Sequence, residues 1–120
     1  MIAGVGCDII EIPRIAAAIE KPAFLERCFT DAERDYITSH GASSAAAAFA
    51  AKEAVSKALG TGISGFGMRD IEILHELNGK PYAVLHGGAA ALAEKIGARV
   101  SISLSHSREY AVAYAVLDAG

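Results

Sequence analysis

Residues 44–59 have the sequence SAAAAFAAKEAVSKAL, which predicts the main helix of the chain. Alanine, lysine, glutamate and leucine are strong helix formers, and they fill almost the whole stretch. Ser43 or Ser44 can cap the amino end of this helix, and Gly60 stands where helices commonly end on a glycine. The other predicted elements lie on either side of this helix in the sequence.

The residues before this helix predict one strand and two short helices. Residues 2–10 read as a short buried strand rich in isoleucine and valine. Residues 14–20 have helical character, and Pro22 then interrupts the run. Thr30 and Glu33 stand three residues apart and form a capping box before a short helix that ends near Ser39.

The residues after the main helix predict mainly strands. Residues 69–77 and 80–86 are strand-like and meet at Asn78-Gly79, a dipeptide typical of a tight hairpin turn. Residues 88–96 have helical spacing, whereas apolar residues alternate with serines over 100–106 and with alanines over 110–116. We therefore expect an α+β fold, a single compact domain of residues 1–120 with the long helix packed on a mostly antiparallel sheet.

The composition narrows the classes of function. The chain has 120 residues, of which 52% are hydrophobic and 21% charged, as in a globular domain with a packed core. Its net charge of -3 disfavours binding to nucleic acid or to an anionic membrane. We expect a cytoplasmic protein, because no apolar stretch is long enough to span a bilayer and the first residues lack a secretory pattern.

Three residues of the main helix lie on one face, and two of them have charged groups that suit a metal and phosphate site. Phe49, Glu53 and Lys57 are each four residues apart, so a carboxylate and an ammonium group stand side by side. Asp8 follows an apolar strand, and together with Glu53 it would supply the oxygen ligands that magnesium prefers. The alternative is an ordinary surface pair of Glu53 with Lys57, and a turn acid at Asp8.

Two further segments have side chains or backbone suited to a ligand. The four glycines at 60, 62, 65 and 67 predict a flexible loop that a ligand can approach closely, although they match neither the Walker nor the dinucleotide pattern. The sequence Ser105-His106-Ser107 lies between two predicted strands, where hydroxyls and ring nitrogens can contact a phosphate or a ribose. No nucleophile elbow accompanies it, so a serine hydrolase is not indicated.

Taken in order, these segments resemble the holo-acyl-carrier-protein synthases, the small bacterial class of phosphopantetheinyl transferases. The similarity covers nearly the whole chain in five ordered motifs: residues 4–12 with Arg14, Phe29-Thr30 with Glu33, residues 49–54 with 57–62, Gly79-Lys80-Pro81, and residues 103–107. The third motif, which contains the main helix and the glycine turn, is the most specific of the five.

The resemblance implies an enzyme that transfers the 4'-phosphopantetheine group of coenzyme A to a serine of an acyl carrier protein, in fatty acid biosynthesis. The products would be the holo carrier and adenosine 3',5'-bisphosphate. The carrier would be a free protein or a domain of a multifunctional synthase. The resemblance also implies a homotrimer with active sites at its subunit interfaces, and subunit contacts suit a chain whose alanines bury little area per residue.

The resemblance assigns roles to individual residues. Asp8 and Glu53 would bind Mg²⁺, with Mn²⁺ as the alternative ion, and Lys57 would be the third catalytic residue. The residues implied for coenzyme A are Lys52, Gly60, Thr61, Gly62, Ile63, Lys80, Pro81, Ser105, His106 and Ser107. Those implied for the carrier protein are Arg14, Lys21 and Arg27.

The sequence departs from the family at Ala48, where these enzymes usually have an arginine suited to a phosphate of coenzyme A. Losing one charge-assisted hydrogen bond to that phosphate would weaken the binding of coenzyme A by about 1.5 to 3 kcal/mol. The first helix is also less basic than an acidic carrier would favour, because Glu20 and Glu26 lie among its cations.

Two other functions remain open from the residues alone. The same acids would suit a metal-dependent hydrolase that cleaves a nucleotide diphosphate with an activated water. A binding or assembly module is the non-enzymatic alternative, with the glycine loop serving a purely structural role.

Overall fold

The computed structural model describes all 120 residues as five strands, five α-helices and one 3₁₀ helix. Their order is β1 (Ile2–Glu11), α1 (Ile12–Ala18), α2 (Pro22–Cys28), α3 (Asp31–His40), α4 (Ala42–Ala58), η1 (Met68–Asp70), β2 (Ile71–His75), β3 (Pro81–Leu85), α5 (Gly87–Ile96), β4 (Ala98–His106) and β5 (Tyr110–Ala119). The strands form two antiparallel sheets, with the orders β1-β5-β4 and β2-β3. No helix combines the length and the apolar character needed to cross a membrane.

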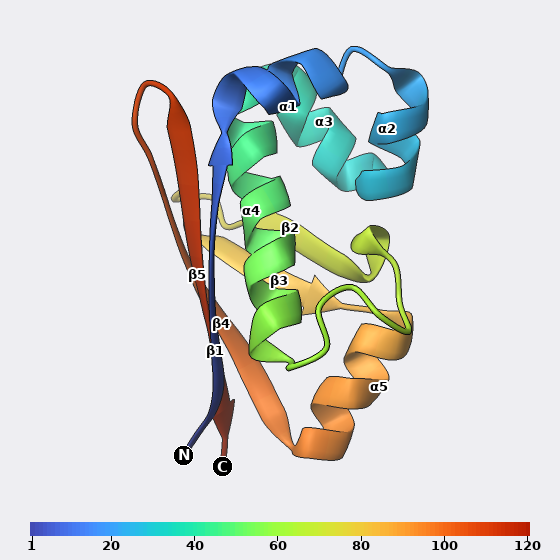
Figure 1. The fold of residues 1–120 in the computed structure, drawn as a ribbon, viewed down its shortest axis with the longest axis vertical. Coiled ribbons are helices and arrows are strands. Elements are labelled where there is room, and N and C mark those ends of the chain that lie inside the picture. The colour runs from blue at the N-terminus through green and yellow to red at the C-terminus, as the bar shows by residue number, and fades with distance from the viewer.

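The long helix α4 is the centre of the molecule. Figure 1 shows it lying along the three-stranded sheet, with α1, α2 and α3 gathered at one end of the molecule and α5 at the other. The β2-β3 hairpin lies beyond α4 in this view, and the two chain termini lie together at the far end of the sheet. The predicted α+β fold, with a long central helix packed on antiparallel strands, is confirmed.

Two glycines of β1 let α4 lie directly against that strand. A Cβ atom at Gly6 would overlap with the carbonyl oxygen of Ala54, and one at Gly4 would overlap with the carbonyl oxygen of Ala58. Because glycine has no side chain, the two backbones approach more closely than any other residue would allow. This close approach sets the distance between β1 and α4, and therefore between the side chains that the two elements carry.

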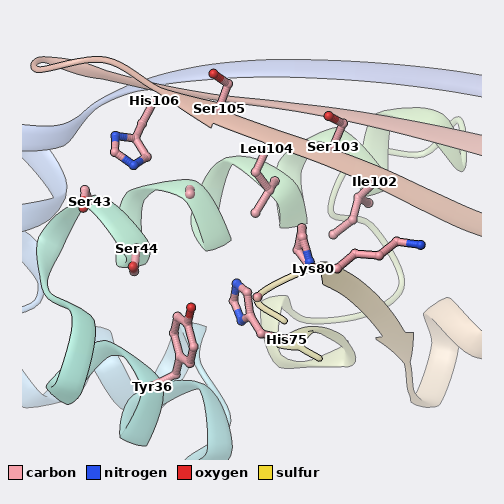
Figure 2. A pocket seen from close by; sticks show the side chains of 13 residues that line it. Tyr36, Ser43, Ser44, His75, Lys80, Ile102, Ser103, Leu104, Ser105 and His106 are labelled. Atoms are coloured by element: carbon pink, nitrogen blue, oxygen red, sulfur yellow. The ribbon is translucent and has the colours of Figure 1, made fainter. Parts of the chain in front are cut away.

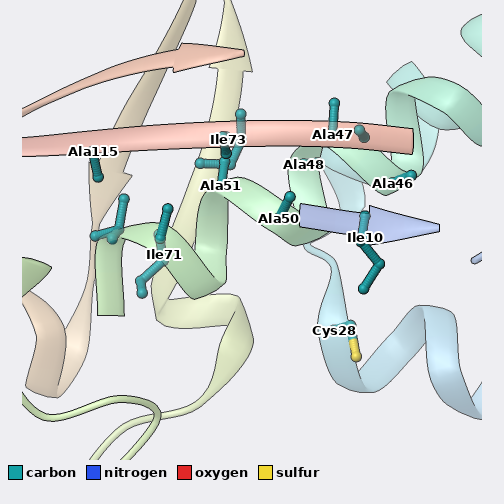
Figure 3. Packing of buried hydrophobic residues seen from close by; sticks show 14 of the residues in the cluster. Ile10, Cys28, Ala46, Ala47, Ala48, Ala50, Ala51, Ile71, Ile73 and Ala115 are labelled. Atoms are coloured by element: carbon teal, nitrogen blue, oxygen red, sulfur yellow. The ribbon is translucent and has the colours of Figure 1, made fainter. Parts of the chain in front are cut away.

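The core between α4 and the sheet consists largely of alanine. Eight alanines of α4 are buried, and three alanines of β5, at positions 111, 113 and 115, are fully buried opposite them. Figure 3 shows several of these small side chains with Ile10, Ile71 and Ile73. The larger residues that alternate with the alanines of β5 therefore lie on the other face of the sheet, away from α4.

Most predicted elements are confirmed, and three local predictions are wrong. Residues 22–28 form α2, because Pro22 begins a helix there rather than only interrupting one. The helix α4 begins at Ala42 after Gly41, and no serine side chain caps it. The predicted hairpin exists, but its loop spans residues 76–80 instead of the two-residue turn expected at Asn78-Gly79.

Candidate active site

The structure brings Asp8 and Glu53 together at the junction of β1 and α4. Both residues line a cavity of about 190 Å³, together with Ile9, Ile10, Arg14 and Phe49. Asp8 and Gly6 lie two residues apart on β1, so both face α4. The close packing at Gly6 thus positions the Asp8 carboxylate beside the Glu53 carboxylate.

Lys57 joins the strand and the helix at this site. Its Nζ donates to the carbonyl oxygen of Cys7 at 2.9 Å and to Oδ1 of Asp8 at 3.1 Å. The side chain is half-exposed, so its ammonium remains accessible from outside the protein. The shared face of Phe49, Glu53 and Lys57 is therefore directed at Asp8, and Lys57 pairs with Asp8 rather than with Glu53.

The Glu53 carboxylate has no hydrogen bond or ion pair within the chain. Burial raises the pKa of Glu53, and the neighbouring Asp8 charge raises that pKa further, while Lys57 and Arg14 lower it. Two carboxylates are thus held close together although one lacks any partner. This arrangement is typical of a site that receives a cation or a proton.

The donor set at this site fits a hard divalent cation that keeps part of its shell for other ligands. The chain holds no group of three or more histidine, cysteine, aspartate or glutamate side chains arranged around one point. Magnesium commonly uses one or two carboxylates and takes its other oxygens from water and phosphates. Asp8 and the unpaired Glu53 satisfy that requirement, whereas a closed site for zinc needs four protein ligands.

A second and larger cavity, of about 430 Å³, lies between α3, α4, the β2-β3 loop and β4. It contains four of the residues predicted for coenzyme A, namely Lys80, Pro81, Ser105 and His106. Figure 2 shows Tyr36 and His75 on the side of this cavity opposite His106. Tyr36 and His75 could not be predicted as site residues, because neither belongs to a motif and they meet only when α3 packs beside β2.

Other predicted ligand residues lie outside both cavities. Ser107 closes the turn between β4 and β5, where its backbone N–H donates to Tyr110 O and its hydroxyl accepts from Tyr110 N. Gly60, Thr61, Gly62 and Ile63 follow the carboxyl end of α4 and line no cavity of the single chain. The backbone of this turn is held by the N–H of Gly62, which donates to Ser56 O.

Lys52 was predicted to contact coenzyme A, and the structure contradicts this. Its side chain is fully buried, and Nζ donates to Oε1 of Glu33 at 2.8 Å and to the carbonyl oxygens of Met68 at 3.0 Å and Ile71 at 2.5 Å. All three ammonium hydrogens are therefore used inside the protein. Glu33 is equally buried and also accepts from the N–H groups of Thr30 and Ile73.

The three cations predicted for the carrier protein occupy different positions. Arg14 borders the cavity that contains Asp8 and Glu53, which is called the acidic cavity below. It also borders a neighbouring cavity of about 270 Å³ that contains Glu11 and Glu109. Lys21 immediately precedes α2, and Arg27 lies in the last turn of that helix with its guanidinium over the Phe24 ring. Arg14 is thus the one cation of the three beside the acidic pair.

Comparison with known proteins connects these features with a family. Residues 4–115 match the family described as the 4'-phosphopantetheinyl transferase superfamily. The chain is 49% identical to a holo-[acyl-carrier-protein] synthase of Clostridium perfringens, over 98% of this chain and 95% of that protein. It is 53% identical to a holo-[acyl-carrier-protein] synthase of Alkaliphilus metalliredigens, over 97% of this chain and 98% of that protein.

Solved structures give the same result. The fold matches the holo-(acyl-carrier-protein) synthase of Bacillus anthracis in complex with CoA (3',5'-ADP), with a TM-score of 0.85 and 38% identity over 100% of this chain and 99% of that chain. It also matches the Helicobacter pylori enzyme in complex with coenzyme A, with a TM-score of 0.84 and 32% identity over 95% and 99% of the two chains. The sequence and the fold agree that the chain belongs to the holo-[acyl-carrier-protein] synthases of the 4'-phosphopantetheinyl transferase superfamily.

Proposed function

We propose that this protein transfers the 4'-phosphopantetheine group of coenzyme A to a serine hydroxyl of an acyl carrier protein. The observation that carries the proposal is the meeting of Asp8 with the unpaired Glu53 carboxylate in one cavity, beside the Lys57 ammonium. The relatives with this fold are named for the same reaction, and two of them were solved with coenzyme A or its nucleotide product.

Asp8 and Glu53 would hold Mg²⁺, or Mn²⁺ in its place. When bound, this ion supplies positive charge that neutralises the diphosphate of coenzyme A. The raised pKa of Glu53 supports the assignment, because its cause includes the Asp8 charge nearby. A cation between these two side chains would relieve that repulsion.

The chain's own groups would then carry out positioning and proton transfer. The carrier serine oxygen attacks the β-phosphorus, the bond from that phosphorus to the adenosine 3',5'-bisphosphate oxygen breaks, and Glu53 accepts the serine proton. Lys57 is suited to the negative charge that develops on the departing phosphate, because its ammonium is half-exposed beside Asp8. Arg14 borders the same cavity and is suited to the acidic surface of a carrier protein.

The larger cavity is the proposed site for the nucleotide end of coenzyme A. Lys80 and His106 offer donors to a phosphate, while Ser103 and Ser105 offer hydroxyls to a ribose or a base. The buried Lys52 is not included in this proposal. Ala48 is also buried, so it contributes no charge in place of the arginine that the family usually has.

We also propose that three copies of the chain assemble and that each active site includes two of them. The acidic cavity and the larger cavity share no residue, and Glu53 and Ala47 face them from different sides of α4. A single coenzyme A molecule would therefore reach both kinds of cavity most directly across a subunit interface. The exposed apolar face of the three-stranded sheet offers a surface for that interface.

The test of the transferase is a mass measurement on the carrier. Purified protein is incubated with coenzyme A, Mg²⁺ and apo acyl carrier protein, and the carrier is then weighed by mass spectrometry. The expected result is a carrier heavier by one phosphopantetheine group. Glu53→Gln should lower the rate at least about a hundredfold, because it removes a ligand and the proton acceptor.

Glu94→Gln is the matched control, since Glu94 is an exposed glutamate in α5, away from both cavities. This control should transfer at the unaltered rate. Full activity of Glu53→Gln would contradict the proposed site. Release of nucleotide from coenzyme A without any carrier would instead indicate the hydrolase alternative.

A further inference from the structure

Three rings form a parallel stack beside the larger cavity. Tyr36 is stacked between His40, with a centroid distance of 3.8 Å, and His75, with a centroid distance of 3.9 Å. The two interplanar angles are only 8° and 2°. Nδ1 of His40 donates to the carbonyl oxygen of Tyr36 at 2.9 Å, which anchors one end of the stack on α3.

The other end of the stack belongs to the cavity itself. Tyr36 and His75 both line it, and Figure 2 shows them side by side across the cavity from His106. Nδ1 of His75 is buried and has no hydrogen-bond partner. An unpaired polar atom in the interior is costly, so this ring is suited to a partner that the free protein does not supply.

The surroundings of His75 in the free protein favour the neutral form of its ring. Burial lowers the pKa of His75, and the neighbouring His40 lowers that pKa further. Tyr36 of α3 stacks directly on this ring, and His40 lies on the far side of Tyr36. Lys80, from the loop before β3, and His106 of β4 line the same cavity. Glu76 follows His75 in the chain but is exposed and makes no ion pair.

An anion in the cavity would reverse this preference. A phosphate beside Lys80 and His106 would attract positive charge onto His75 and offer an oxygen to one of its ring nitrogens. The face of Tyr36 already lies parallel to the imidazole, where a cation is attracted by the aromatic ring. The His75 ring can therefore stay stacked on Tyr36 both when it is neutral in the free protein and when it is protonated in a complex.

We propose that His75 takes up a proton when a phosphate-bearing nucleotide binds in this cavity, and that it thereby adds to the selectivity for such nucleotides over uncharged ones. The proposal rests on the proposed function for the choice of nucleotide. The three residues of α4 that line the cavity, Ser43, Ser44 and Ala47, are uncharged. A protonated His75 would therefore add a positive charge close to the ligand that α4 does not provide.

Isothermal titration calorimetry of the full-length protein with adenosine 3',5'-bisphosphate tests this directly. Titrations in buffers of different ionisation enthalpy, between pH 6 and 8, give the number of protons taken up together with the affinity. Because one pKa unit corresponds to a factor of ten, the affinity should rise about tenfold as the pH falls for each unit by which binding raises the pKa. Adenosine should bind without this proton uptake.

His75→Gln and His75→Phe should take up fewer protons on binding than the unaltered protein, and their affinity should depend less on pH. His86→Gln is the matched control, because His86 pairs with Glu72 and lies outside the cavity. NMR titration of the His75 ring in the unaltered protein gives a second test that needs no substitution. Its pKa should rise when the bisphosphate is added.

An unchanged His75 pKa in the complex would overturn the proposal, as would equal proton uptake by folded His75→Gln and the unaltered protein. Both results would leave the transferase intact, since carrier loading is measured separately. Failure of the unaltered protein to bind the bisphosphate at all would overturn this inference and the nucleotide site together. The two failures are therefore distinguishable.

Discussion

The Glu53 carboxylate combines partial burial, a neighbouring Asp8 charge and the absence of any partner. Because its pKa is raised in the folded protein, the folded state holds this proton more tightly than the unfolded chain does. The contribution of Glu53 to stability therefore becomes less favourable as the pH rises from below its ordinary pKa through the raised value. In the absence of metal, ionised Glu53 opposes folding at neutral pH.

Glu53→Gln should therefore be at least as stable as the unaltered protein at pH 7 in metal-free buffer, although it loses transfer activity. Urea unfolding at pH 7 and at pH 4 measures this, and the difference between the two proteins should shrink at pH 4, where Glu53 is largely protonated. A clearly lower free energy of unfolding for Glu53→Gln at pH 7 would mean that the ionised carboxylate has a stabilising partner. That result would contradict a Glu53 carboxylate without a hydrogen bond or ion pair in the chain.

Lys52 stands beside Glu53 in the sequence but has the opposite environment. It is fully buried, and it links α4 to Glu33 of α3 and to the backbone around η1 and β2. Lys52→Ala would leave the Glu33 charge buried without its cation. We expect a loss of about 3 to 5 kcal/mol in the free energy of unfolding, measured by urea denaturation.

The double variant Lys52→Met with Glu33→Leu separates the charge from the packing. This variant also leaves the N–H groups of Thr30 and Ile73 without their acceptor. It should still cost less than Lys52→Ala, because no unpaired ion remains inside the protein. Lys95→Ala, at an exposed lysine in the last turn of α5, is the control and should change the stability by less than about 0.5 kcal/mol. Equal stability of Lys52→Ala and this control would show that the buried pair contributes nothing.

At the scale of elements, the contact between β1 and α4 determines whether the acidic pair can form. Gly6→Ala would place a methyl group against the backbone of Ala54, which cannot move aside as a flexible side chain would. Overpacking of this kind costs about 1 to 3 kcal/mol, and sometimes more. Separation of the two elements would also move Asp8 away from Glu53, so carrier loading should fall together with the melting temperature.

Gly67→Ala is the matched control for that substitution. Gly67 has a negative φ of -101°, and a Cβ atom there would meet nothing within 4 Å. This variant should keep its melting temperature. Unchanged stability and activity in Gly6→Ala would contradict the direct packing of α4 on β1.

The sequence predicted those elements whose signals are local. The main helix followed from helix formers and a final glycine. The last two strands followed from alternation of residue types, and the strands of the first hairpin followed from two strand-like runs on either side of Asn78-Gly79. α2 was missed because a proline has two meanings, as the breaker of one helix and as the first residue of another. The division of the strands into two sheets depends on pairing between distant segments, which alternation alone does not specify.

The candidate site could be predicted only in part from the sequence. Asp8 and Glu53 stood out because two acids next to apolar elements suggest a metal, and the structure brings them into one cavity. Lys52 was misassigned, because its position in a motif does not reveal that its face of α4 is turned into the core. Tyr36 and His75 come from separate elements, and their stacking is a consequence of tertiary packing.

At the scale of the whole molecule, one face of the three-stranded sheet has no partner within the chain. Val5 and Ile9 of β1 are 66% and 60% exposed, and Tyr114 of β5 is 58% exposed. Cys7 lies between Val5 and Ile9 in β1 and is paired across the sheet with Tyr114. Ser103 of β4 is paired with Tyr114 on its other side. The side chains of Val5, Ile9 and Tyr114 therefore lie on the same face of the sheet. Exposed apolar clusters of this kind commonly mark protein interfaces.

Tyr114→Arg tests whether this face joins the three proposed copies. Light scattering after size-exclusion chromatography should give the mass of a trimer for the unaltered protein and a smaller mass for the variant, because burying three unpaired guanidinium groups near one axis is unfavourable. Carrier loading should fall in parallel, since each proposed site needs residues from two copies. Tyr82→Arg, at a tyrosine of β3 that is also exposed, is the control and should remain trimeric. A monomeric unaltered protein with full transfer activity would contradict the shared site, because the acidic cavity of one copy would then work with a nucleotide cavity of the same chain.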